Sequence, residues 1–119
     1  MSFSQKELLK GTLGPIILKL LADHKKMYGY EITQHIKETS DGKILIKEGS
    51  LYPALHKLEA DGLLESEELQ VGGRTRKYYK LTRSGKAASK SASEELLQFL
   101  QTIHLIMNPP KKLAYGSIG

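Results

Sequence analysis

The side chains of this sequence that could do chemistry are mainly cations, and they gather in one stretch. Between Val71 and Ser93 there are seven Lys or Arg residues and not one acid. These seven are Arg74, Arg76, Lys77, Lys80, Arg83, Lys86 and Lys90. So one-sided a segment favours a polyanionic partner, and the phosphate backbone of nucleic acid fits best. An anionic membrane surface fits less well, because the stretch carries no apolar anchor.

A second set of polar side chains lies on one face of a helix that the spacing predicts over residues 49–61. Leu51, Leu55 and Leu58 recur at i, i+4 and i+7, which makes one apolar stripe. The opposite side carries short, hydroxylated, aromatic or cationic side chains, namely Ser50, Tyr52, Pro53, His56 and Lys57. A helix buried on one side and polar on the other can lie in the major groove of DNA. An ordinary amphipathic helix with a solvated face shows the same pattern.

Local residue chemistry predicts where this helix begins and ends. We expect Ser50 or Glu48 to cap its start, so that Pro53 falls in the first turn, where proline is tolerated. We expect Gly62 to end it.

No catalytic or metal-binding arrangement is recognisable in the sequence. It lacks a nucleophile with a nearby base, a pair of carboxylates and a phosphate loop, and Gly72-Gly73 fits a hairpin turn. The four histidines, His24, His35, His56 and His104, are scattered and lack the spacing of metal ligands. We therefore expect no enzyme, no metal and no cofactor.

The elements that would hold the polar side chains follow from periodicity. Apolar residues at helical spacing predict helices over 5–23 and 28–39, the first interrupted by Gly11, Gly14 and Pro15. Gly29 would allow a close approach of the backbone at the N-terminus of the second helix, where free N–H groups can accept a phosphate.

Strand patterns occupy the middle of the chain. Alternation predicts a short strand at 43–47, and richness in Tyr and Thr supports two more at 63–69 and 76–82. The last two would be joined by a glycine hairpin at 71–75 with a cationic tip. Three helices followed by such a hairpin is the order of a winged helix-turn-helix. The predicted fold class is mainly α with a small β-hairpin wing (α+β).

A long helix is predicted after the wing, from Thr82 as its cap to about residue 107. Its apolar residues alternate at three and four steps, namely Ala92, Leu96, Phe99, Leu100, Ile103, Ile106 and Met107. Two copies of the chain would cover this seam for each other, which predicts a homodimer. Alternatively the helix folds back on the first helix as core, and both can hold.

Length, composition and segment boundaries predict the organisation of the chain. With 119 residues the chain is one domain with one modest core. We divide it into a DNA-binding unit (1–82), a dimerisation helix (83–108) and a flexible tail (109–119). The absence of cysteine and of a signal or membrane-spanning segment favours a cytoplasmic location.

Four stretches together resemble the PadR family of bacterial transcriptional regulators, in its short form with one C-terminal helix. They are LLKGTLGPIILKLL (8–21), YGYEI (28–32), EGSLYPALHKLEADGLLES (48–66) and GGRTRKYYKLTRSGK (72–86). They occur in the expected order and spacing, within about residues 5–107. LYPALHKLE followed by RKYYKLT is far more specific than a single helix-turn-helix match.

The resemblance implies a homodimeric repressor that binds a near-palindromic operator in double-stranded DNA. The residues expected at the DNA are Lys6, Tyr28, Tyr30, Ser50, Leu51, Tyr52, Pro53, His56, Lys57, Arg74, Arg76 and Lys77. In such families a small aromatic or drug-like effector lodges between the subunits and weakens DNA binding. This chain has no Trp to stack on a flat ligand, and Phe99 is the only aromatic residue of the last helix. The identity of the effector is therefore left open. Three alternative functions are left open as well, namely an activator, a nonspecific DNA binder and a protein-interaction module.

Overall fold

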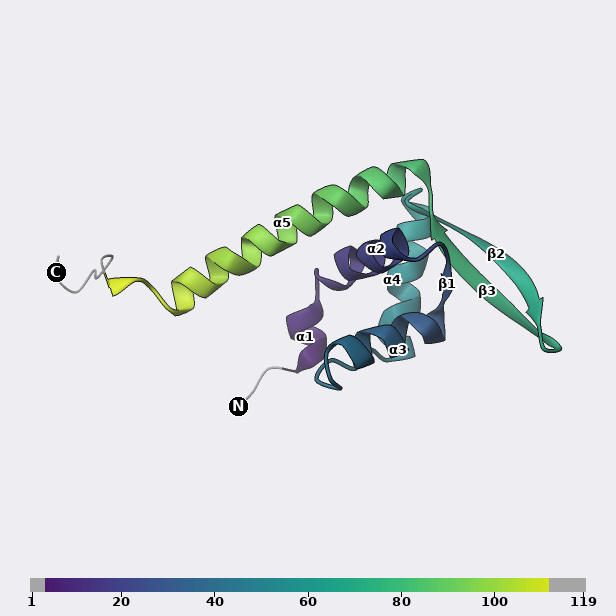
Figure 1. The fold of residues 1–119 in the computed structure, drawn as a ribbon, viewed down its shortest axis with the longest axis horizontal. Coiled ribbons are helices and arrows are strands. Elements are labelled where there is room, and N and C mark those ends of the chain that lie inside the picture. The colour runs from purple at the N-terminus through teal and green to yellow at the C-terminus, as the bar shows by residue number, and fades with distance from the viewer. Residues whose placement is uncertain (1–3, 112–119) are drawn as a thin grey trace.

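Five helices and three strands make up the fold that the computed structural model describes for residues 4–111 (Figure 1). In chain order they are α1 (Gln5–Leu9), α2 (Leu13–Asp23), β1 (Met27–Tyr28), α3 (Gly29–Thr39), α4 (Glu48–Ala60), β2 (Leu64–Val71), β3 (Arg74–Leu81) and α5 (Arg83–Met107). The sheet has the order β1-β3-β2 and is antiparallel throughout. This mainly helical fold with a small wing confirms the predicted fold class.

The predicted helix over 5–23 is two helices. The chain turns between them at Gly11, whose φ of +87° lies in the left-handed region that glycine adopts readily. Pro15 then falls in the first turn of α2, where a missing N–H does not interrupt the helix.

The strand predicted at 43–47 is wrong, because this segment is a loop between α3 and α4. Side chains take the backbone groups that a strand would pair. The Ser40 hydroxyl accepts from the N–H of Ile44 (3.0 Å), and the Gln5 amide accepts from the N–H of Leu45 (3.3 Å) and donates to the carbonyl of Lys43. The third strand is instead β1, where Met27 pairs with Tyr79.

The helix at the centre of the sequence prediction, α4, begins at Glu48 with Lys47 as its N-cap and without a side-chain cap. The predicted caps are therefore wrong, and Pro53 lies in the second turn. Because proline has no N–H, the carbonyl of Gly49 lacks its usual helical donor there. The end of the helix agrees with prediction: Gly62 has a φ of +77°, and the N–H of Leu63 reaches back to the carbonyl of Leu58 (3.0 Å).

The wing is a regular hairpin that is longer than predicted. Strands β2 and β3 stay paired from Leu64 with Leu81 to Val71 with Arg74. The turn is Gly72-Gly73, with φ values of +57° and +77°, and a two-residue turn of this kind requires positive φ at both positions.

One core lies where α2, α3, α4 and the sheet meet. Its buried side chains come from all of these elements, and they are Ile17, Leu18, Leu20, Leu21, Met27, Ile32, Ile36, Leu51, Leu55, Leu58, Leu64, Tyr79 and Leu81. The start of α5 packs on this core with Ala88 and Ala92, whereas its far half runs clear of the helices (Figure 1). None of the helices between residues 4 and 111 is long and apolar enough to cross a bilayer.

Candidate nucleic-acid interface

The two sides of α4 are as different in the structure as in the sequence. Leu51 and Leu55 are fully buried, whereas Tyr52, Pro53, His56 and Lys57 are exposed and Ser50 is half-buried. The polar set thus forms one exposed face. Leu51 was expected among the DNA contacts, but its side chain is 1% exposed and belongs to the core.

Tyr52 packs against the start of α3. A Cβ placed on Gly29 would lie 2.7 Å from the Tyr52 hydroxyl oxygen, so a side chain at position 29 would force the Tyr52 ring to shift. The Tyr52 side chain remains 38% exposed. One residue therefore fills the space between α3 and α4 and also belongs to the exposed polar face of α4.

The start of α3 is already partly occupied by an acid. The Glu31 carboxylate accepts from the N–H of Tyr28 (3.1 Å). This contact competes with an anion for the helix start that we expected to receive a phosphate.

On the outer face of the wing, aromatic rings hold an arginine. The Arg76 guanidinium carbon lies 4.5 Å from the centre of the Tyr28 ring, a cation–π distance. Tyr28 also contacts the edge of Tyr78 (5.3 Å) and stacks with Tyr30 (6.5 Å between ring centres). The structure thus brings together Arg76, Tyr28 and the exposed Tyr30, all of which were expected at the DNA.

Lys77 points to the opposite face of the wing, toward α4. Its ammonium nitrogen lies 3.9 Å from a carboxylate oxygen of Glu59 and 5.5 Å from the centre of the Tyr79 ring. Burial raises the pKa of the Tyr79 hydroxyl; the positive charge of Lys77 opposes this shift, and the negative charge of Glu59 adds to it. The opposite directions of Arg76 and Lys77 could be predicted from the sequence, because neighbouring residues on a strand face opposite sides of the sheet.

Other expected contact residues differ in their surroundings. Lys57 pairs with Asp61 (3.1 Å), one helical turn along α4, whereas Arg74 at the wing tip has no ion pair among residues 4–111. Lys6 is exposed on α1, which lies beside the loop after α3, at the end of α3 away from the wing (Figure 1). It is therefore not brought together with Arg76.

The seam predicted on the last helix divides into a covered and an uncovered part. Ala92 packs on the protomer's own core and Leu96 is half-buried. The remaining seam residues are 39–78% exposed, namely Phe99, Leu100, Ile103, Ile106 and Met107. The helix thus folds back on α2 with its first half, as the alternative prediction had it, and leaves the second half bare.

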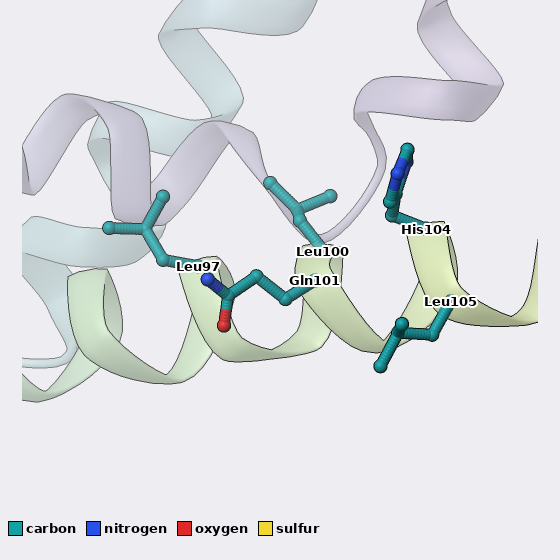
Figure 2. Close-up of a pocket in the computed structure, with 5 residues that line it drawn as sticks. All are labelled: Leu97, Leu100, Gln101, His104 and Leu105. Atoms are coloured by element: carbon teal, nitrogen blue, oxygen red, sulfur yellow. The ribbon is translucent and has the colours of Figure 1, made fainter. Parts of the chain in front are cut away.

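A shallow open hollow of about 470 Å³ lies along the bare half of α5. Figure 2 shows Leu97, Leu100 and His104 pointing to one side of the helix and Leu105 to the other, with Gln101 between them. Leu97 and Leu105 were not predicted, because they fall outside the stripe of three and four steps.

The histidines are less scattered than the sequence indicated. The rings of His24 and His35 meet edge to face, with 4.9 Å between their centres. Across residues 4–111, no three His, Asp or Glu side chains come together in a way that could hold a metal ion.

Comparison with known proteins places these features in a family. The model of the transcriptional regulator PadR-like family matches residues 17–91. A transcriptional regulator of Mycobacterium tuberculosis, Rv3488, is 45% identical over 83 residues, which cover 67% of this chain and 74% of that protein. An uncharacterised protein of Lysinibacillus sphaericus is 34% identical over 105 residues, covering 87% and 94% of the two chains.

Solved structures agree with this result. A transcriptional regulator from Clostridium thermocellum has a TM-score of 0.75 and 33% identity, covering 82% of this chain and 95% of its own. A PadR family transcriptional regulator from Eggerthella lenta has a TM-score of 0.72 and 28% identity, covering 87% and 88%. The chain therefore belongs to the PadR-like family of transcriptional regulators, whose function is exerted on DNA.

Proposed function

We propose that this PadR-like regulator is a homodimeric repressor that binds a near-palindromic operator and is released from it by a small-molecule effector. The observation that carries the proposal is that one protomer has two separate exposed surfaces of different character. One is the polar face of α4 beside the cationic wing, and the other is the bare apolar half of α5. Because a DNA regulator acts at the chromosome, we also propose a cytoplasmic location.

DNA contact is assigned to the exposed face of α4 and the outer side of the wing. Ser50, Tyr52, Pro53, His56 and Lys57 would enter the major groove and meet base edges. Arg74 and Arg76 would bind phosphates on either side and hold the register without reading sequence. The alternative of a protein-interaction module is less favoured, because these exposed residues of α4 include no acid.

Dimerisation is assigned to α5 on the grounds of continuity. On a helical wheel, the residues that pack α5 on its own core fall on the same stripe as the bare residues further along. The stripe continues past the point where the protomer can cover it, and a second copy offers a matching stripe. We accordingly propose residues 1–82 as the DNA-binding unit and 83–108 as the dimerisation helix.

Effector binding is assigned to the hollow along α5. Leu97, Leu100 and Leu105 give it an apolar lining, with Gln101 and His104 as its polar groups. A small apolar compound with one polar substituent suits this lining. A compound that prefers another separation of the two α5 helices would lower operator affinity by its differential binding.

The test is a footprint on DNA from upstream of the protein's own gene, combined with a reporter driven by the same DNA. We expect two protected half-sites about one helical turn apart, and reporter activity that rises when the gene is deleted. One undivided patch, or protection of every sequence alike, would contradict the dimeric operator. Reporter activity that falls on deletion would identify an activator.

A further inference from the structure

One carboxylate joins α4 to both strands of the wing. Glu59 lies in the last turns of α4, and its two oxygens have different partners. One accepts a hydrogen bond from the hydroxyl of Ser66 on β2 (2.6 Å), and the other lies 3.9 Å from the ammonium of Lys77 on β3. The buried ring of Tyr79 lies beside Lys77 on the same face of the wing.

This cluster contributes little to the folding stability of the protein. The side chains of Lys77 and Glu59 are 44% and 33% exposed, and ion pairs so open to water contribute little to folding stability. The cluster does, however, link α4 to both strands of the wing, and it holds one wing cation on the side away from Arg76.

We propose that Glu59 is a positioning residue for DNA recognition, which holds Lys77 and Ser66 and thereby fixes the angle between α4 and the wing. This inference rests on the proposed DNA interface. In it, Lys77 is part of the protein's own framework, and the wing meets phosphates through Arg74 and Arg76. Specific binding needs α4 and the wing to reach the duplex together, whereas nonspecific binding needs only charge. Loss of Glu59 should therefore reduce specific binding selectively.

The experiment measures fluorescence anisotropy of the full-length protein on operator and scrambled DNA at several salt concentrations. Glu59→Gln keeps an oxygen that can accept from Ser66 but removes the charge that holds Lys77. We expect the ratio of operator to scrambled affinity to fall about threefold or more, as for residues coupled by direct contact. Glu65→Gln is the matched control, because Glu65 pairs with Lys80 (3.4 Å) and carries the same charge. It should leave the ratio unchanged.

Lys77→Gln provides a second and independent reading. If Lys77 is part of the framework, the slope of log affinity against log salt stays at its wild-type value while the ratio falls. The double variant with Glu59→Gln should then fall no further than Lys77→Gln alone. The salt slope and the affinity ratio of Lys77→Gln alone do not need Glu59 to be replaced, so they still test the inference if Glu59→Gln folds poorly, which the thermal midpoint would show.

Each other result has a definite meaning. A slope that becomes shallower by about 0.9 in Lys77→Gln would show that Lys77 neutralises a phosphate, and would overturn the inference. Equal ratios in Glu59→Gln and Glu65→Gln would overturn it as well. Neither result would touch the proposed function, whereas a wild-type protein that does not distinguish operator from scrambled DNA would overturn both.

Discussion

Thr82, between β3 and α5, ties the start of α5 to the turn between α4 and β2 through three hydrogen bonds. Its hydroxyl donates to the carbonyl of Gly62 (2.7 Å) and accepts from the N–H of Gly85 (3.0 Å), and its own N–H donates to Leu63 (3.0 Å). Gly85 lies so close to this junction that a Cβ would come within 2.0 Å of the Leu63 carbonyl oxygen. Single residues thus set the direction in which α5 leaves β3.

Gly85→Ala should therefore destabilise the fold. The obstacle is backbone and cannot rotate away, so we expect the free energy of unfolding to fall by about 2 kcal/mol. Gly49→Ala is the control, because nothing lies within 4 Å of a Cβ there, and it should change stability by less than ~1 kcal/mol. Chemical denaturation measures both, and equal effects would show that the contact with Leu63 has been misjudged.

Tyr79 makes the stability depend on pH in the alkaline range. Burial raises the pKa of its hydroxyl above the ordinary value of 10.0, so the unfolded chain gives up this proton first as the pH rises. The contribution to stability is complete below pH 10.0 and is lost as the pH rises through the folded pKa. Tyr79→Phe should remove this part of the decline in a series of denaturant titrations. An unchanged alkaline decline in the variant would mean that other groups cause it.

At the scale of elements, the most distinctive feature is that one apolar stripe of α5 is covered at its start and exposed further along. Ala88 and Ala92 cover the core of their own protomer, while Ile103 and Met107 further along have nothing to cover. A substitution in the bare part should affect assembly and leave the protomer's fold intact.

The double variant Leu100→Lys with Ile103→Lys tests this expectation. Both side chains are partly exposed already, at 47% and 39%, so the thermal midpoint of the protomer should change little. We expect the dimer to dissociate, because four added charges would face one another across the interface. Gln98→Lys with Thr102→Lys adds the same charge to the opposite side of the helix and should remain dimeric. Sedimentation gives the mass of each, and a dimeric seam variant would contradict the assignment.

The elements predicted correctly from sequence are those with local chemical causes. Thr82 as a cap, Gly62 as a helix end and Gly72-Gly73 as a turn each follow from the residue at that position. The loop at 43–47 was mistaken for a strand because Gln5, nearly forty residues earlier, takes part of its backbone hydrogen bonding.

The candidate site was predictable to a similar degree. The exposed face of α4 follows from periodicity, but the role of Glu59 depends on Ser66 and Lys77, which only the folded wing brings to it. Strand β1 gave no signal either, because two residues are too few to show alternation.

At the scale of the whole molecule, two arms extend from one core in different directions. The wing projects on one side of the helices, and the far half of α5 projects on the other (Figure 1). With α5 as the dimer contact, two copies would carry their α4 helices at a fixed separation. A palindromic operator is the DNA arrangement that suits such symmetry.

The most direct test of this account is the salt-dependent affinity of the wild-type protein for DNA from upstream of its own gene and for scrambled DNA of equal length. We predict tighter binding to the native fragment by at least about a thousandfold, together with a steep loss of affinity as salt rises. Equal affinity for the two fragments at every salt concentration would contradict recognition of an operator at its own gene.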